Sequence, residues 1–324
     1  MIFSCAKYRL YFRFEARTSR AVMRYKDTYL IEGGGMVAEC PLFAGLSADD
    51  LPDYEDQLAR VCRSGLEYVP DYSSIIFGVE SLRRSLAGPA DAQQSWSVPI
   101  NGLVWMGDKR LMQQRVEQKL AEGFRCIKLK IGGIDFDDEL DMVASLRRRF
   151  SPDDLEIRLD ANGAFTPGNA LARLDALSRH SIHSLEQPVR AGQWEIMERI
   201  CRESPIPIAL DEELIGVRSD ADKAAMLDAI RPQYIILKPA LCGGFAHSDA
   251  WIAAATARGI GWWATSALES NVGLAAIGSW LTSKYTVTLP QGLGTGALFT
   301  NNFPIPLTVA SGRLHFLGTQ ASGL

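Results

Sequence analysis

Two lysines spaced two residues apart, Lys128 and Lys130, lie in the apolar run CIKLKIGG of residues 126–133. A strand with this pattern places both ammonium groups on one face, because side chains alternate between the two faces of a strand. A buried amine beside a second cation loses its proton more readily than a solvated one, so the pair predicts a general base with a depressed pKa. For such a pair alone, the alternative is a solvated strand edge at which lysines discourage aggregation.

Three carboxylates and a further lysine end the next four strand-like segments: Asp160, Glu186, Asp211 and Lys238. Each alone has a simpler interpretation as a turn residue, a helix cap or a lysine at a strand end. Their shared position in successive units favours a common site instead. Three carboxylates that converge in an apolar interior cannot all stay ionised without a cation. All-oxygen ligands predict Mg²⁺ rather than Zn²⁺, with Mn²⁺ tolerated.

Short apolar segments that alternate with longer amphipathic ones are expected to position these groups. Eight strands are predicted at residues 98–105, 126–131, 155–160, 182–186, 206–211, 234–238, 260–265 and 286–290, with helices such as 108–121 and 137–149 between them. This alternation predicts a (β/α)8-type barrel, or a modified 7+1 form of it, over residues 96–303. The carboxyl ends of its strands would bring the charged groups to one mouth. A doubly wound sheet is the alternative fold, but no GxGxxG motif follows an early strand.

Residues 1–95 have a different pattern and predict a separate α+β capping domain. A meander of three strands is expected at residues 8–14, 24–31 and 36–39 with a glycine turn at 33–35, followed by helices at 53–68 and 73–87. The strand-like tail 304–324 is expected to return to this domain. Two loops, 15–20 and 43–47, would then close the barrel mouth, exclude water and set substrate specificity.

The composition, 47% hydrophobic and 22% charged residues over 324, is typical of a folded globular protein. A formal net charge of −4 without a long basic run does not favour nucleic-acid binding. No signal peptide or membrane span is predicted. Six cysteines occur singly, without a CxxC pair, which favours reduced thiols in the cytoplasm over disulfides or a zinc site. The pattern does not specify an oligomeric state.

The motif order KLK, LDANGAF, LEQPV, ALDEEL and ILKPALCGGF resembles the muconate-lactonizing subgroup of the enolase superfamily across the whole chain. Members of this family abstract the proton α to a carboxylate and stabilise the resulting enediolate on Mg²⁺. The resemblance implies three metal ligands and three lysines with separate roles. They are Asp160, Glu186 and Asp211 for the metal, Lys130 as the general base, Lys128 as its neighbour and Lys238 on the opposite face.

Within this subgroup, the segments Ala264–Ser270 and Gln291–Asn302 resemble those of the o-succinylbenzoate synthases. Dipeptide epimerases usually carry Asp-x-Asp at the end of the last strand, where this chain has no carboxylate. The resemblance implies a small-molecule carboxylate substrate and a syn dehydration of 2-succinyl-6-hydroxy-2,4-cyclohexadiene-1-carboxylate, a step of menaquinone synthesis. Two alternatives are an N-acylamino acid racemase or dipeptide epimerase with Lys130 and Lys238 as opposed bases, and a catalytically silent barrel that acts as a binding protein.

The same resemblance implies three substrate contacts: Asn162 on the metal side of the mouth, and Ser266 and the backbone near Gly292 at the succinyl end. Arg158 lies one layer deeper on the face that carries the first metal ligand. We expect it to be a buried partner of the carboxylates, with a substrate contact as the alternative. Strand alternation points Glu212 away from the metal ligand before it, so Glu212 is expected to support the site from outside.

Overall fold

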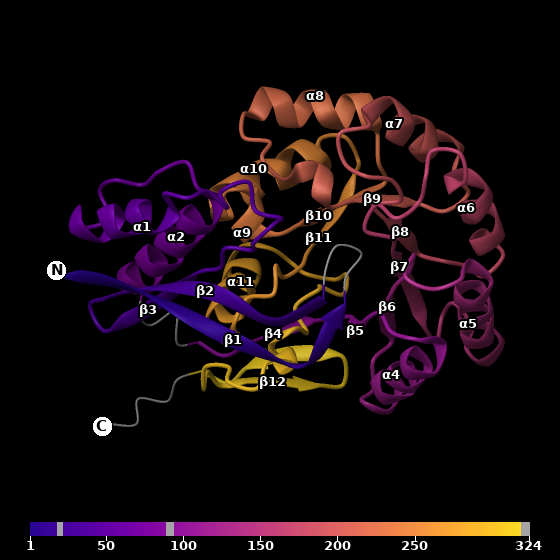
Figure 1. Ribbon diagram of the computed structural model, residues 1–324, viewed down its shortest axis with the longest axis horizontal. Helices are drawn as coiled ribbons and strands as arrows, with labels where there is room; N and C mark the ends of the chain where they lie inside the picture. The colour runs from indigo at the N-terminus through magenta and orange to yellow at the C-terminus, as the bar shows by residue number, and fades with distance from the viewer. Residues whose placement is uncertain (18–21, 89–93, 319–324) are drawn as a thin grey trace.

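A computed structural model of the chain describes residues 1–17, 22–88 and 94–318. An N-terminal sheet and two helices lie against a parallel barrel, whose helices α4 to α8 form an arc outside the strands (Figure 1). The N-terminal elements are β1 (Phe3–Arg17), β2 (Val22–Gly33), β3 (Met36–Cys40), α1 (Tyr54–Arg63) and α2 (Ser73–Ala87). The predicted meander and helices in this region are therefore confirmed. The tight turn between β2 and β3 requires positive φ at Gly34 and Gly35, which glycine adopts without steric cost.

Seven parallel strands form the barrel wall in the order β5 to β11. They are β5 (Gly102–Val104), β6 (Cys126–Lys130), β7 (Glu156–Asp160), β8 (Ser184–Glu186), β9 (Ile208–Leu210), β10 (Tyr234–Leu237) and β11 (Gly261–Ala264). The helices are α4 (Lys109–Ala121), α5 (Phe136–Arg149), α6 (Ala170–Ser178), α7 (Trp194–Glu203), α8 (Asp220–Ile230), α9 (Pro239–Cys242), α10 (Gly244–Thr256) and α11 (Asn271–Lys284), with short 3₁₀ turns η1 (Glu212–Leu214) and η2 (Gly296–Leu298). The predicted barrel is confirmed.

The prediction of an eighth strand at residues 286–290 is wrong, because the described backbone there forms no strand. Two residues further on close the barrel instead. Gln291 bridges to Ile100 beside β5, and Gly292 bridges to Thr265 after β11, both in parallel orientation. The amide of Gly292 donates to the Ala264 carbonyl at 2.8 Å. Closure by so few residues leaves this side of the wall as a loop rather than a strand.

Alternation along the strands separates an apolar exterior from a charged interior. Ile127, Leu129, Ile157 and Leu159 are fully buried between the barrel wall and the helices, in the main hydrophobic core. The residues between them face the barrel interior. Packing of one face against helices therefore fixes the direction of the functional side chains on the other.

The C-terminal segment was expected to return to the N-terminal domain, and this expectation is wrong for the described residues. β12 (Leu307–Ala310) and β13 (Arg313–Phe316) form a three-stranded antiparallel sheet with β4 (Trp96–Pro99), which leads into the barrel. Residues 319–324 lie outside the described part of the chain. In that described part, no helix is long and apolar enough to cross a membrane. All six cysteines are free thiols, as expected.

The N-terminal sheet is held to the barrel by a buried carboxylate as well as by apolar contacts. Glu39 on β3 is fully buried and accepts hydrogen bonds from the amides of Ser270 (2.9 Å) and Gly273 (3.0 Å) at the start of α11. Its other oxygen accepts from Thr28 Oγ1 at 2.7 Å. A carboxylate at a helix N-terminus satisfies amides that have no intrahelical partner.

We expect Glu39→Gln to lower the free energy of unfolding by on the order of 3 kcal/mol, because an amide nitrogen cannot accept from the buried N–H groups. Glu32→Gln, which changes an exposed carboxyl on the neighbouring strand, is the matched control and should shift stability by less than about 0.5 kcal/mol. Urea unfolding followed by tryptophan fluorescence measures both. Equal stability of the two variants would contradict the role given to Glu39.

Candidate active site

A cavity of about 340 Å³ opens at the carboxyl ends of the barrel strands. Residues Phe43–Leu46 of the N-terminal part line it, which confirms that this loop covers the mouth. Of the other predicted loop, residues 18–20 lie outside the described part of the chain. The lining includes most of the predicted site: Lys128, Lys130, Asp160, Asn162, Glu186, Lys238, Ser266 and Gly292.

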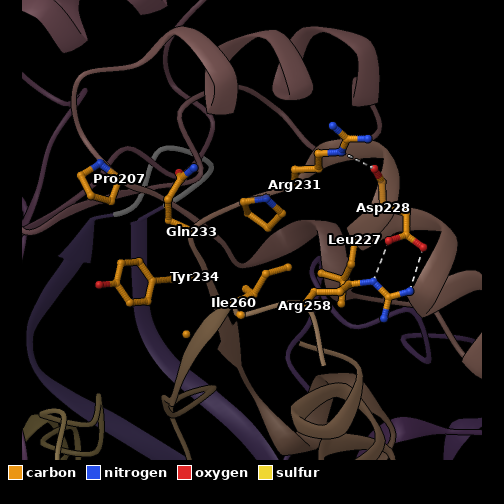
Figure 2. A pocket seen from close by; sticks show the side chains of 11 residues that line it. Pro207, Leu227, Asp228, Arg231, Gln233, Tyr234, Arg258 and Ile260 are labelled. Atoms are coloured by element: carbon orange, nitrogen blue, oxygen red, sulfur yellow. Dashed lines mark hydrogen bonds and ion pairs between the residues drawn. The ribbon is translucent and has the colours of Figure 1, made fainter. Parts of the chain in front are cut away.

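A second, more open cavity of about 730 Å³ lies at the opposite end of the barrel, where β9, β10 and β11 begin. Figure 2 shows that its charged side chains are largely paired with one another: the Arg258 guanidinium donates to both carboxylate oxygens of Asp228, at 2.8 and 2.7 Å. None of the predicted site residues line it. The chemistry is therefore expected in the smaller cavity.

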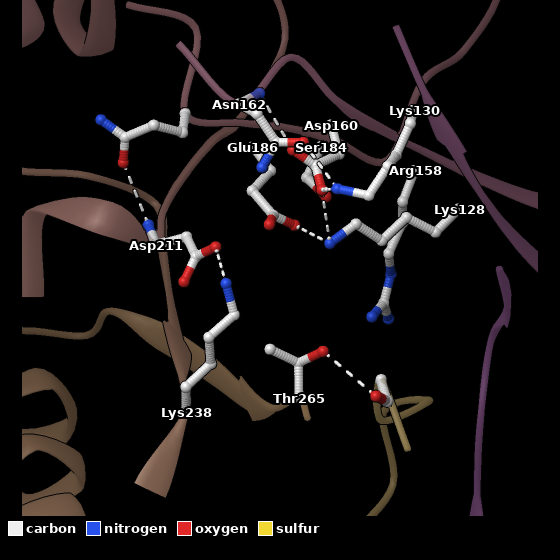
Figure 3. A network of polar contacts seen from close by, with 12 residues as sticks. Lys128, Lys130, Arg158, Asp160, Asn162, Ser184, Glu186, Asp211, Lys238 and Thr265 are labelled. Atoms are coloured by element: carbon white, nitrogen blue, oxygen red, sulfur yellow. Dashed lines mark hydrogen bonds and ion pairs between the residues drawn. The ribbon is translucent and has the colours of Figure 1, made fainter. Parts of the chain in front are cut away.

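The two lysines of β6 point at carboxylates on the neighbouring strands (Figure 3). Lys128 Nζ lies 2.9 Å from Asp160 Oδ2 and also forms an ion pair with Glu186. Lys130 Nζ lies 2.9 Å from the same Asp160 oxygen and 2.5 Å from Asn162 Oδ1. The parallel register explains this arrangement, because Lys130 pairs with Asp160 and Asp160 with Glu186 across adjacent strands.

Lys238 reaches the same cavity from the far side of the barrel, where it forms an ion pair with Asp211 (Figure 3). Its side chain is 12% exposed, and that of Asp211 is almost completely buried. The structure therefore places Lys130 and Lys238 on different walls of one cavity, with a row of carboxylates between them.

Carboxylates as well as the neighbouring lysine surround the Lys128 ammonium. Burial alone would lower the pKa of this ammonium, but the carboxylates of Asp160, Glu186 and Asp211 outweigh burial and raise it well above its usual range. For Asp160, burial is likewise outweighed, and the two β6 lysines hold the pKa of this carboxyl well below its usual range. Burial and the charge of Asp160 raise the pKa of Glu186. The prediction of a depressed pKa considered the two like charges on β6 and did not include the carboxylates on the neighbouring strands.

The three predicted metal ligands lie at this end of the barrel, but lysine ammonium groups lie against them. Within the described residues, no three acidic, histidine or cysteine side chains are grouped closely enough to hold a metal ion. The residues nevertheless fit a hard divalent cation, because the donors are all carboxylate oxygens and Glu186 Oε1 is buried without a hydrogen-bond partner. A buried carboxylate oxygen in that state favours an added cation.

Asn162 lines the cavity as expected, but its side chain is engaged with protein groups. Its oxygen accepts from Lys130, and its nitrogen donates to Glu212 Oε1 at 3.2 Å. Glu212 therefore faces the site, and the expectation that it points away is wrong. Strand alternation ends at Asp211 because the chain enters the 3₁₀ turn η1 directly afterwards.

Ser266 and Gly292 both line the cavity. Ser266 Oγ is hydrogen-bonded to Thr295 Oγ1 at 2.6 Å. A Cβ at residue 292 would lie 2.0 Å from Thr265 Oγ1, so only glycine fits where the barrel closes. Its amide already donates to Ala264, and therefore it is not available to a substrate.

Arg158 is buried below the cavity rather than in its lining. Its guanidinium donates to Glu156 Oε1 at 2.6 Å and to the Pro290 carbonyl at 2.7 Å. It also lies 4.3 Å from the centre of the Trp263 ring. It is thus a buried partner of a carboxylate as expected, but of Glu156 rather than of the predicted metal ligands.

Sequence reasoning missed the β5 wall of the cavity, which Asn101, Leu103 and Trp105 form. Lys130 Nζ lies 5.7 Å from the centre of the Trp105 ring, a cation–π arrangement. Trp105 in turn packs on Phe12 and Phe14 of the N-terminal sheet. Alternation within the predicted strand 98–105 was a signal that could have identified all three residues, because they share one face.

Two buried ionisable residues contact the backbone of the loop after β11, which carries Ser266. Glu269 is fully buried, and its Oε2 accepts from the Ala267 amide at 2.7 Å. Lys26 from β2 donates to the Leu268 carbonyl at 3.1 Å. Burial, opposed by the charge of Lys26, raises the pKa of Glu269 to about 7. The protonated form of this carboxyl is therefore favoured by folding.

A carboxyl whose pKa is about 7 in the folded chain and 4.5 unfolded binds more proton when folded. Stability should therefore fall as pH rises from about 4.5 to 7, by on the order of 3 kcal/mol for this group. We expect Glu269→Gln to remove most of that fall, whereas Glu67→Gln, at an exposed carboxyl, should leave it unchanged. Urea unfolding at pH 5 and pH 7 measures this change in the free energy of unfolding. Identical pH dependence in wild type and Glu269→Gln would contradict the assignment.

Comparison with known proteins agrees with this geometry. The o-succinylbenzoate synthase of Desulfotalea psychrophila is 45% identical, over 94% of this chain and 96% of that protein. An N-succinylamino acid racemase of an Amycolatopsis species is 34% identical, over 60% of this chain and 51% of that protein.

Solved structures agree with the fold. The crystal structure of MenC from Desulfotalea psychrophila has a TM-score of 0.78 and 41% identity, and covers 98% of this chain and 99% of that one. Muconate lactonizing enzyme from Pseudomonas fluorescens, complexed with muconolactone, has a TM-score of 0.83 at 20% identity and covers 98% and 93% of the two chains, which shows the fold alone. The enolase C-terminal domain-like family matches residues 111–322. The chain therefore belongs to the enolase superfamily.

Proposed function

We propose that this chain is an o-succinylbenzoate synthase, a lyase that dehydrates 2-succinyl-6-hydroxy-2,4-cyclohexadiene-1-carboxylate to 2-succinylbenzoate for menaquinone synthesis. The observation that carries the proposal is the 45% identity to a protein of that name over nearly the full length of both chains. Lysines on different walls of one cavity, with carboxylates between them, support it. The six free thiols support the further proposal of a cytoplasmic location.

We propose that Asp160, Glu186 and Asp211 hold Mg²⁺, with Mn²⁺ as a substitute. Enolase superfamily enzymes generally use Mg²⁺, and the all-carboxylate donor set with an unpartnered oxygen on Glu186 supports that choice here. When bound, such a cation supplies positive charge that offsets the charge growing on the substrate carboxylate as its α-proton leaves.

Lys130 is the proposed base. Asp160 and Asn162 fix the position of its Nζ at 2.9 and 2.5 Å, so the amine is oriented before the substrate arrives. It takes the α-proton and then donates a proton to the departing hydroxyl on the same face, which makes the elimination syn. Formation of an aromatic ring drives the loss of water.

Lys128 and Lys238 are proposed to remain cationic during this sequence. Lys128 forms ion pairs with Asp160 and Glu186, and Lys238 forms one with Asp211. Lys238 lies across the cavity from Lys130, where a cation stabilises a planar anion from its other face. Ser266 and the closing loop at Gly292 are the proposed neighbours of the succinyl chain.

Turnover of the cyclohexadiene carboxylate, followed by ultraviolet absorbance, should depend on both the metal and the base. We expect EDTA to abolish activity and added Mg²⁺ to restore it. Lys130→Ala should lower kcat by about 10³-fold, because general base catalysis contributes roughly 10²- to 10⁴-fold. Lys284→Ala, at an exposed lysine of α11, is the control and should be active. Wild-type turnover by Lys130→Ala would contradict the assignment of the base.

The racemase alternative uses the same two lysines, and relatives with that name match part of the chain. It predicts that the α-proton of an N-succinyl amino acid exchanges with solvent. We expect no exchange in D₂O, as measured by proton NMR with Mg²⁺ present, over a time in which the cyclohexadiene carboxylate is fully converted. Exchange at a comparable kcat/KM would contradict the proposed specificity.

A further inference from the structure

Asn101 lies at the floor of the active-site cavity, immediately before β5. Its backbone amide donates to the Gln291 carbonyl at 3.0 Å, so the barrel closure fixes its position. A Cβ on Gly294 would lie 3.4 Å from the Asn101 carbonyl, which shows how closely the closing loop approaches. The closing loop therefore contacts the backbone of Asn101 at two points.

The Asn101 side chain makes no hydrogen bond within the described residues, although the residue is only 2% exposed. Its Oδ1 is enclosed without a partner, and therefore the amide nitrogen is the polar atom open to the cavity. The Asn101 amide nitrogen has no hydrogen-bond partner within the described residues, and an oxygen atom of a ligand in the cavity can accept a hydrogen bond from it.

The other neutral polar side chains of this cavity are satisfied by the protein. Asn162 bonds to Lys130 and Glu212, Thr265 Oγ1 donates to the Gly292 carbonyl at 3.1 Å, and Ser266 pairs with Thr295. Asn101 differs from them in having a free donor. The floor of the cavity therefore has one side-chain donor, on Asn101, that can bind a hydrogen-bond acceptor.

The position of Asn101 identifies which end of a substrate it meets. Leu103 pairs in register with Lys128, so Asn101 is two residues deeper in the barrel than that lysine. In a closed eight-position barrel, β5 lies opposite β9, whose end carries Asp211. A substrate whose carboxylate faces the acidic side therefore directs its remaining chain toward Asn101.

We propose that Asn101 is a further substrate-binding residue, whose side-chain N–H donates to a carbonyl or carboxylate oxygen of the substrate's acyl chain. This assignment rests on the proposed function and adds a determinant of specificity to it. A substrate acyl chain with an oxygen atom at this depth accepts a hydrogen bond from the Asn101 side-chain N–H. A purely alkyl chain leaves the amide buried and unpaired, and such sites discriminate strongly against analogues that lack the matching group.

The test compares binding of two compounds by calorimetry in the presence of Mg²⁺: 2-succinylbenzoate and 2-pentylbenzoate, which lacks the chain oxygens. We expect Asn101→Leu to weaken binding of 2-succinylbenzoate by about 10- to 100-fold, as the loss of one buried hydrogen bond predicts, and that of 2-pentylbenzoate by less than about 3-fold. KM for the cyclohexadiene carboxylate should rise by a similar factor, with a smaller change in kcat.

Two controls separate this role from a structural one. Gln114→Leu makes the same kind of polar-to-apolar change on the exposed face of α4 and should alter neither affinity. The Mg²⁺ affinity of Asn101→Leu should match that of wild type and its Tm should not fall, and Asn101→Asp, which keeps the shape but loses the donor, should behave like Asn101→Leu toward 2-succinylbenzoate.

Unchanged binding of 2-succinylbenzoate by Asn101→Leu would overturn the inference, as would an equal loss for both compounds, since that would reflect cavity shape alone. Either result with an active wild type leaves the proposed reaction intact. A wild type that neither binds 2-succinylbenzoate nor converts the cyclohexadiene carboxylate would instead contradict the proposed function, and the inference with it.

Discussion

The pairing of lysines with carboxylates inside the barrel is the interaction on which the rest of the site depends. Lys128 contacts Asp160 and Glu186, and Lys238 contacts Asp211, in a setting where an unpaired charge would be very costly. Removal of one partner would leave the other buried and uncompensated. The apolar outer faces of the same strands supply the packing that holds these charges in place. Stability and chemistry therefore come from opposite faces of the same short strands.

The N-terminal part completes this site by covering it. Residues Phe43–Leu46 form part of the cavity lining, and the aromatic side chains of β1 pack on Trp105 beside Lys130. Glu39 fixes the sheet to the start of α11, which follows the loop that carries Ser266. The covering layer and the catalytic wall are thus joined through buried contacts, which exclude water from a reaction that depends on strong electrostatic interactions.

Satisfied and unsatisfied polar groups divide the cavity into two kinds of surface. On the acidic side, carboxylates and ammonium groups neutralise one another, and Glu186 Oε1 has an unused lone pair suited to a cation. At the floor, the side-chain nitrogen of Asn101 has no hydrogen-bond partner within the described residues and is suited to an oxygen atom of a ligand. A ligand whose carboxylate can bind such a cation, and whose chain carries an oxygen atom, matches both. The proposed cyclohexadiene substrate has this form.

The sequence by itself determined the repeating barrel units, the N-terminal meander and the strand ends that carry Lys130, Asp160, Glu186, Asp211 and Lys238, because local hydrophobic periodicity and turn residues encode them. It could not determine the barrel closure at Gln291 and Gly292, the pairing of β12 and β13 with β4, or the inward direction of Glu212. Only the tertiary structure decided these features, and also the pKa of Lys128 and the free donor of Asn101. Each depends on which groups from distant parts of the chain become neighbours, and that is set by packing rather than by local pattern.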